Sequence, residues 1–114
     1  MARRGDVLVL KRRLGFGTGG AEERFVVIQD EAVGRVVATT IAVALDAATA
    51  VHDGSPVAVL VSAAEAGSRT PHVAVATHAA TIPLDRFQPA AVGRLEPGTL
   101  AELDGVLKVV LGLG

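Results

Sequence analysis

Apolar residues in this chain gather into short runs that are separated by turns rich in glycine, proline and aspartate. Runs of this length favour β-strands, in which successive side chains point to opposite faces of a sheet. The pattern predicts strands at residues 6–10, 24–29, 36–45, 57–61 and 72–82.

The predicted strand at 36–45 is apolar on both faces. One face carries larger residues and the other carries alanines, so we expect this strand to be covered on both sides. Along 72–82, alternation instead places two histidines with small residues on one face. The larger set in the first strand is Val37, Thr39, Ile41, Val43 and Leu45, and the histidine face in the second is His72, Ala74, Ala76 and His78.

Helical spacing is clearest at the end of the chain. Pro97 suits the first position of a helix, and apolar residues recur from there to Leu111 at helical spacing. Gly105 inside this helix costs about 1 kcal/mol relative to alanine, so we expect packing to hold it. Residues 30–35 predict one helical turn, 46–56 and 66–71 predict loops, and 83–87 predict a turn or a single helical turn.

Several short strands closed by one helix predict a small, strongly bent sheet or a partial barrel. The chain has 114 residues, half of them apolar and about a fifth charged, which fits one domain over residues 1–114. No apolar run reaches the roughly 18 residues of a membrane span, so we expect a cytoplasmic protein without a membrane partner. The lack of cysteine excludes disulfides, thiolate metal sites and a cysteine nucleophile, and no histidine pair has metal-site spacing.

Positive charge is concentrated near the start of a chain whose formal net charge is −1. Such a local field could follow the phosphates of a nucleic acid. An equally good interpretation is a solvated sheet edge that its charges keep from aggregating. The basic residues of this segment are Arg3, Arg4, Lys11, Arg12 and Arg13.

Residues 15–20 satisfy the G-x-G-x-x-G pattern of dinucleotide-binding proteins and follow a predicted strand. That fingerprint requires a helix next, whose N-terminus faces the pyrophosphate. Residues 24–29 predict another strand instead, so we expect no nucleotide cofactor here.

Motifs at both ends of the chain, with weaker ones between them, resemble consecutive segments of one family. They are Arg4-Gly5-Asp6-Val7, Gly17-Thr18, residues 25–30, residues 72–82 with 84–87, Gly93-Arg94-Leu95, Pro97 and residues 99–104. In this order they are similar to the opening strand, first long loop, second strand, late strand and closing segment of the MazF/PemK family of ribonuclease toxins.

The resemblance implies a CcdB/MazF-like fold that is mainly β with α. We expect an SH3-like, partly open barrel of about five to seven strands with a C-terminal amphipathic helix. The resemblance also implies a homodimer that cuts single-stranded RNA without a metal or cofactor and is silenced by a cognate antitoxin protein. A sister branch of the fold poisons DNA gyrase by binding, so the fold alone does not distinguish cutting from binding.

The family's chemistry needs a base and an arginine. The base takes the proton of a ribose 2'-hydroxyl, which attacks the adjoining phosphate, and the arginine fork neutralises the charge that grows there. Arg24 stands where the family keeps its catalytic arginine, although Phe25 follows it in place of the family's proline. The alternative is a surface arginine paired with Glu22 or Glu23.

Asp46 stands just after the third predicted strand, where the family has a threonine or serine. An ionised carboxylate repels phosphate, so Asp46 does not replace that hydroxyl but could serve as a base. The favoured alternative is an aspartate that ends a strand or caps a turn. Thr49 is the nearest hydroxyl and a further catalytic candidate.

His78 is another candidate for moving the proton, because imidazole titrates near neutrality. Thr77 and His78 replace an acidic residue and a glutamine of the family. The alternative is a partly buried histidine bonded to the backbone. His52 and His72 lie in or beside predicted turns.

The glycine loop is expected to close over RNA, or to block it until a partner leaves. Phe16 at its tip could stack on a base, which matters in a chain that has three phenylalanines and no tyrosine or tryptophan. The residues predicted to bind RNA are Lys11, Arg12, Arg13, Phe16, Thr18 and Thr77.

Two hypotheses of different class remain open at this level. The first is an endoribonuclease toxin in which Arg24 stabilises the transition state and His78, or a carboxylate such as Asp46, moves the proton. The second is a catalytically weakened relative that binds a protein or RNA without cleavage, as the changes at Phe25 and Asp46 suggest.

Overall fold

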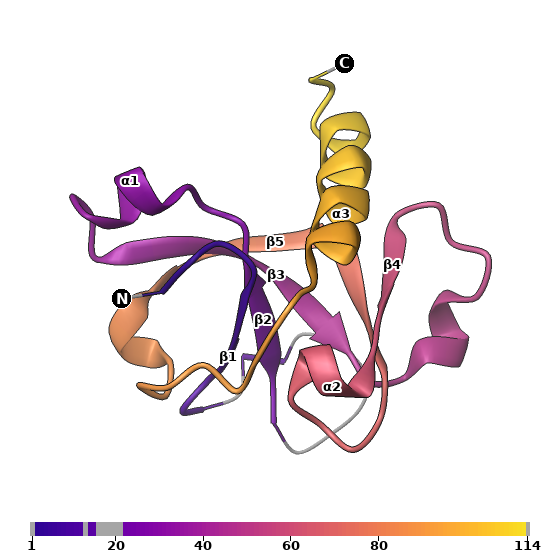
Figure 1. The fold of residues 1–114 in the computed structure, drawn as a ribbon, viewed down its shortest axis with the longest axis horizontal. Helices are drawn as coiled ribbons and strands as arrows, with labels where there is room; N and C mark the ends of the chain where they lie inside the picture. The colour runs from indigo at the N-terminus through magenta and orange to yellow at the C-terminus, as the bar shows by residue number, and fades with distance from the viewer. Residues whose placement is uncertain (1, 13, 16–21, 114) are drawn as a thin grey trace.

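The computed structural model describes residues 2–12, 14–15 and 22–113. Within these residues, six strands form one antiparallel sheet in the order β4-β5-β3-β2-β1-β6, which is curled and open at its edges (Figure 1). The predicted mainly-β fold with a C-terminal helix is confirmed. The strands are β1 (Asp6–Val9), β2 (Arg24–Val27), β3 (Thr39–Asp46), β4 (Ala58–Val61), β5 (His72–Pro83) and β6 (Gly93–Arg94).

An irregularity in the pairing of β3 with β5 bends the sheet. Val43 pairs with Ala79 and Leu45 with Ala74, so residues 75–78 of β5 lie opposite Ala44 alone. Extra residues on one strand of a pair increase its twist and turn the strand away from flat pairing. Ala74 and Ala76 share one core cluster, as expected, but alternation does not continue through the bend, because Ala80 packs against the other cluster.

The sheet buries apolar side chains on both of its faces. On one face, Val43 and Leu45 join a cluster with α3. On the other, Ala42 and Ala44 join a cluster that contains Phe25 and Phe87, whose ring centroids lie 6.0 Å apart in an edge-to-face arrangement. The prediction that the third strand is covered on both sides is confirmed for residues 42–45. It is wrong for Val36, Val37 and Ile41, which are exposed, and the strand begins only at Thr39.

The terminal helix α3 (Pro97–Val110) begins with proline at its first turn, as predicted, and packs on β4 and β5 (Figure 1). Leu103 and Leu107 are buried and hold the helix on the sheet. The expectation that the apolar helical repeat continues to Leu111 was wrong, because Leu111 lies beyond the helix and is exposed. Gly105 itself is exposed, with open space around the position of a Cβ. Packing of the leucines, and not of Gly105, therefore stabilises this helix. Within the described residues, no helix is long and apolar enough to span a bilayer.

Short helical segments connect the strands. The predicted turn after residue 30 is α1 (Glu31–Gly34), whose N-cap side chain is Asp30. Inside the predicted loop at 46–56 lies the 3₁₀ helix η1 (Thr49–His52), and η2 (Leu84–Arg86) follows β5.

The sequence analysis missed helix α2 (Ala63–Ala66) between β4 and β5. Ser62 accepts a hydrogen bond from the Glu65 backbone N–H, and the Glu65 side chain accepts one from the Ser62 N–H. This reciprocal pair is a capping box, and the Ser62-x-x-Glu65 spacing was a readable signal for it.

Leu103→Ala should lower the free energy of unfolding by about 2–5 kcal/mol, because it removes a fully buried side chain and leaves a cavity between α3 and the sheet. Urea denaturation of the purified protein measures this change. Val109→Ala on the same helix is the matched control, since Val109 is 78% exposed and should change stability by less than about 0.5 kcal/mol. Equal effects of the two substitutions would contradict the assigned helix face.

Candidate active site

Arg24 is the first residue of β2 and pairs in register with Val9 of β1 and Leu45 of β3. Its Nε donates to the carbonyl oxygen of Ala66 at 3.0 Å, and its Nη2 donates to that of Gly67 at 3.2 Å. The side chain is 12% exposed. Among the described residues these contacts use Nε and Nη2, so the guanidinium keeps donor capacity at Nη1 for a ligand.

The alternative of Arg24 as a surface arginine is therefore only partly supported. Its Nη2 lies 3.4 Å from Glu22, but Glu22 is exposed and such pairs contribute little stability. The carboxylate of Glu23 is turned elsewhere and accepts hydrogen bonds from the backbone N–H groups of Leu14 and Gly15. The two carbonyls at the end of α2 thus fix the position of Arg24.

The end of α2 approaches the backbone of β6 very closely. A Cβ on Gly93 would lie 2.1 Å from the carbonyl oxygen of Glu65, and a Cβ on Gly67 would lie 2.1 Å from that of Val92. Gly67 also has a positive φ of 63°, which side chains other than glycine rarely adopt. Both glycines are therefore needed to place the carbonyls that hold Arg24.

Glu65 links α2 to the start of α3. Its carboxylate accepts hydrogen bonds from the backbone N–H of Ser62 at 3.0 Å and from that of Glu96 at 2.8 Å. Burial by itself raises the pKa of Glu65, but the donors from Glu96 and Ser62 outweigh it and lower the pKa below its ordinary value of 4.5. The ionised carboxylate thus ties α2, whose end holds Arg24, to the start of α3.

A cavity of about 430 Å³ opens beside Arg24. Its charged lining consists of Glu22, Arg24 and Arg69, together with the polar backbone of Gly67 and Ser68. Two guanidinium groups facing one cavity suit a phosphate, which an arginine fork can bind through two oxygens. Arg69 lies in the turn after α2 and was missed, because no motif in the sequence marks it.

Asp46 ends β3 and is buried. Its Oδ1 accepts a hydrogen bond from the Ala48 N–H at 3.0 Å, and its Oδ2 lies 2.8 Å from Nε2 of His52. The first contact is the turn-capping role favoured from the sequence. The second contact, between Asp46 and His52, was missed in the sequence analysis. The two residues are six positions apart in a loop, and no helix or strand period brings such a pair together. Thr49 begins η1 between these two partners.

His72 opens β5 and is buried, and its Nδ1 lies 3.1 Å from the carbonyl oxygen of Thr70. Burial is the main cause that lowers its pKa, and the positive charge of Arg24 lowers it further. The Thr70 carbonyl and the negative charge of Asp46 act in the opposite direction. Arg24 and Asp46 therefore lie within electrostatic range of the same imidazole.

Thr77 and His78 lie in the bent part of β5, opposite Ala44. Thr77 is exposed and His78 is half-buried. Ala44 also pairs with Phe25, so the bend is one strand away from β2. The fold thus places these two residues across β3 from the strand that carries Arg24.

A second basic cavity, of about 360 Å³, is lined by Lys11, Arg12, Asp85 and Arg86. The backbone N–H of Lys11 donates to the carbonyl of Arg86 at 2.8 Å, which joins the end of β1 to η2. Arg86 was missed as a basic partner because η2 is distant in sequence. The predicted RNA-binding residues Arg13, Phe16 and Thr18 lie outside the described residues.

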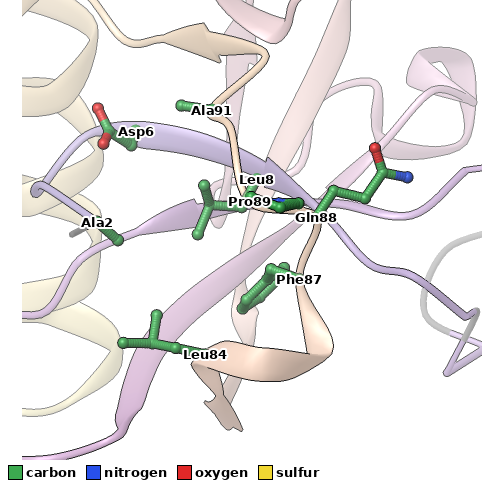
Figure 2. A pocket seen from close by; sticks show the side chains of 8 residues that line it. All are labelled: Ala2, Asp6, Leu8, Leu84, Phe87, Gln88, Pro89 and Ala91. Carbon is green, nitrogen blue, oxygen red and sulfur yellow. The ribbon is translucent and has the colours of Figure 1, made fainter.

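An apolar hollow of about 270 Å³ lies on the sheet face opposite to Arg24. Figure 2 shows Leu8, Leu84 and Phe87 around it, with Asp6 at its rim. Among the described residues that line it, Asp6 is the only one with a charged side chain. Its carboxylate pairs with Arg94 at 2.6 Å. This hollow is therefore less suited to a phosphate than the arginine cavity. In the described part of the chain, no three or more His, Cys, Asp or Glu side chains gather closely enough to hold a metal.

A curled, open antiparallel sheet that is covered by a C-terminal helix defines a CcdB/MazF-like protein. A family model described as PemK-like, MazF-like toxin of type II toxin-antitoxin system matches residues 3–111. The chain belongs to this toxin family.

Solved structures agree in fold. An endoribonuclease from a mycobacterial species, in complex with its cognate antitoxin, is 20% identical over 100% of this chain and 98% of its own, with a TM-score of 0.79. MazF from Deinococcus radiodurans is 20% identical over 97% and 96% of the two chains, with a TM-score of 0.75. The Mycobacterium tuberculosis toxin MazF-mt6 is 15% identical over 96% and 98%, also with a TM-score of 0.75. No curated protein matches the chain.

Gly93→Ala should destabilise the protein by about 1–3 kcal/mol or more, because the new methyl group meets backbone atoms at the end of α2. Thermal unfolding measures the loss. Gly98→Ala is the matched control, since open space surrounds that position, and it should leave the midpoint unchanged or raise it slightly. An unchanged midpoint for Gly93→Ala would contradict the close approach of α2 and β6.

Acid should weaken the protein partly through Glu65. Its folded pKa is lowered, so the stability it contributes is present above the unfolded pKa, near 4.5, and is lost as the pH falls through the folded pKa. Denaturant unfolding from about pH 7 down to about pH 3 tests this. Glu65→Gln should be less stable at neutral pH and should lose less of its stability in acid; a pH dependence identical to that of the wild type would contradict the assignment.

Proposed function

We propose that this chain is the toxin of a type II toxin-antitoxin pair and that it cleaves single-stranded RNA as an endoribonuclease. The observation that carries the proposal is the guanidinium of Arg24, which two carbonyls hold at the wall of a cavity that a second arginine also lines. Membership of the toxin family supports the same reaction. The antitoxin-bound mycobacterial structure carries the name endoribonuclease.

In the proposed reaction, a ribose 2'-oxygen loses its proton and forms a bond to the adjoining phosphorus. The bond from phosphorus to the 5'-oxygen breaks, which leaves a cyclic phosphate on one product and a 5'-hydroxyl on the other. Arg24 stabilises the charge on the phosphoryl oxygens, and Arg69 adds a second positive charge on the cavity wall. We propose that no metal or cofactor takes part.

The exchange of the family's proline for Phe25 does not argue against catalysis. Along β2 the side chains of Arg24 and Phe25 point to opposite faces, and Phe25 is fully buried in the cluster that contains Phe87. Phe25 is thus a core residue on the face away from the cavity. The binding-only alternative consequently depends on Asp46 alone.

The proposed RNA track extends from Arg24 toward the second basic cavity. Lys11, Arg12 and Arg86 would bind phosphates there, where their charges are exposed to solvent. Thr77, on the exposed part of the β5 bend, and the loop residues Arg13, Phe16 and Thr18 complete the proposed interface. His78 and Asp46 are the proton carriers proposed from the sequence, and Thr49 is a further candidate.

We further propose a homodimer in the cytoplasm that a cognate antitoxin silences. The support is the antitoxin in the mycobacterial complex and an apolar end of the molecule. Val109, Leu111 and Leu113 are all exposed near the end of α3, which suits a surface that a protein partner covers.

Incubation of the purified chain with a long unstructured RNA and excess chelator should give discrete fragments that end in cyclic phosphate. Intact RNA at high protein excess would reject the proposed activity and favour the binding-only alternative. Arg24→Ala should lower the cleavage rate by about 10²–10³-fold, because it removes a donor to the transition state.

Arg24→Lys is the matched control for charge. Lysine keeps the positive charge but cannot bind both carbonyls and a phosphate through one planar fork, so most of the rate should still be lost. His78→Ala tests the proton carrier proposed from the sequence. Full cleavage by both Arg24 variants would show that the assigned site is wrong.

A further inference from the structure

We propose that His52 is the catalytic residue that accepts the 2'-hydroxyl proton and that Asp46 is its positioning residue. This inference rests on the proposed ribonuclease function and names the base that the function requires. It follows from a contact between two elements, β3 and η1, that lie on either side of a loop.

The contact favours one tautomer of His52. An ionised carboxylate is only an acceptor, so Oδ2 of Asp46, 2.8 Å from Nε2, favours the form in which Nε2 carries the proton. The lone pair then lies on Nδ1, at the opposite side of the ring. A carboxylate that orients an imidazole in this way is the arrangement that general-base catalysis uses on many folds.

Burial separates the two roles. Asp46 is 3% exposed and its two oxygens are engaged by Ala48 and His52, so it is poorly placed to meet a bulky phosphodiester directly. The side chain of His52 is 16% exposed, several times more than that of Asp46. Of the two, the imidazole is thus the more accessible group.

The dyad lies at the same end of the sheet as Arg24. Leu45, the residue before Asp46, pairs directly with Arg24 across β2 and β3. His72 lies within electrostatic range of both Arg24 and Asp46, and η1 packs against β5, the strand that His72 opens. Arginine and histidine thus approach one end of the sheet from neighbouring elements.

The proton balance is simple. Nδ1 of His52 takes the proton as the 2'-oxygen bonds to phosphorus, and the 5'-oxygen leaves and takes a proton from water. His52 then releases its own proton to solvent, which restores the starting enzyme. The other histidines fit less well: His72 is buried with Nδ1 at the Thr70 carbonyl, and His78 lies across β3 in the bend of β5.

Steady-state cleavage of a short fluorogenic RNA by the full chain tests the proposal. His52→Gln keeps a donor for Asp46 but has no basic nitrogen, so kcat should fall by about 10²–10⁴-fold with little change in KM. His52→Ala should fall similarly, and added imidazole should restore part of its rate. A purely structural histidine would not respond to imidazole.

Asp46→Asn tests the positioning role. Asparagine keeps the shape of aspartate, but its amide can donate a hydrogen bond to Nε2 of His52. The ring proton then lies on Nδ1, so Nδ1 has no free lone pair to accept the 2'-hydroxyl proton. We expect kcat to fall by at least about 10²-fold, and imidazole should not restore it because the pocket is still filled. Val51→Ala, an exposed change in the same 3₁₀ helix, is the matched control and should keep the wild-type rate.

The outcomes separate this inference from the function on which it rests. Wild-type chain that leaves RNA intact would overturn the proposed function, and this inference with it. Wild-type cleavage together with full cleavage by folded His52→Gln would overturn the inference alone. Loss of kcat in His52→Gln, with imidazole rescue of His52→Ala, would support it.

Discussion

The candidate site depends on one close approach of backbones, between the end of α2 and strand β6. Two glycines permit it, since a side chain at Gly67 or Gly93 would collide with main-chain atoms. The approach leaves the carbonyls of Ala66 and Gly67 at the position where they bind the guanidinium of Arg24. Arginine has many rotamers in solution, so fixing it before substrate binds removes an entropic cost from the reaction. The scaffold and the chemistry therefore share the same few contacts.

The bend of the sheet allows each of its two faces to carry a core cluster. Because residues 75–78 of β5 oppose Ala44 alone, the strand turns, and α3 can cover one face while a second cluster fills the other. Arg24 and Phe25 alternate on β2 and point to these two faces. A sequence change beside the arginine can consequently alter the core and leave the cavity intact.

Asp46 illustrates how a fold accommodates a buried carboxylate at the end of a strand. A carboxylate beside a phosphate site is unfavourable if it faces the substrate. In this chain it is buried, caps the following turn through one oxygen and meets His52 through the other. The carboxylate is thereby paired with an imidazole of the same loop. The turn that η1 forms is what makes this arrangement possible.

The sequence by itself determined the approximate positions of five strands, the burial of the second half of the third strand on both faces, and the terminal helix from Pro97. These follow from periodicity and motifs, which act within a few residues. It also contained the Ser62-x-x-Glu65 signal for α2, which the sequence analysis missed. Tertiary structure alone decided that Ala66 and Gly67 hold Arg24, that Arg69 and Arg86 join the basic cavities, and that the face alternation fails in β5. The physical reason is that such contacts join residues far apart in the chain, and only the register and bend of the sheet bring them together.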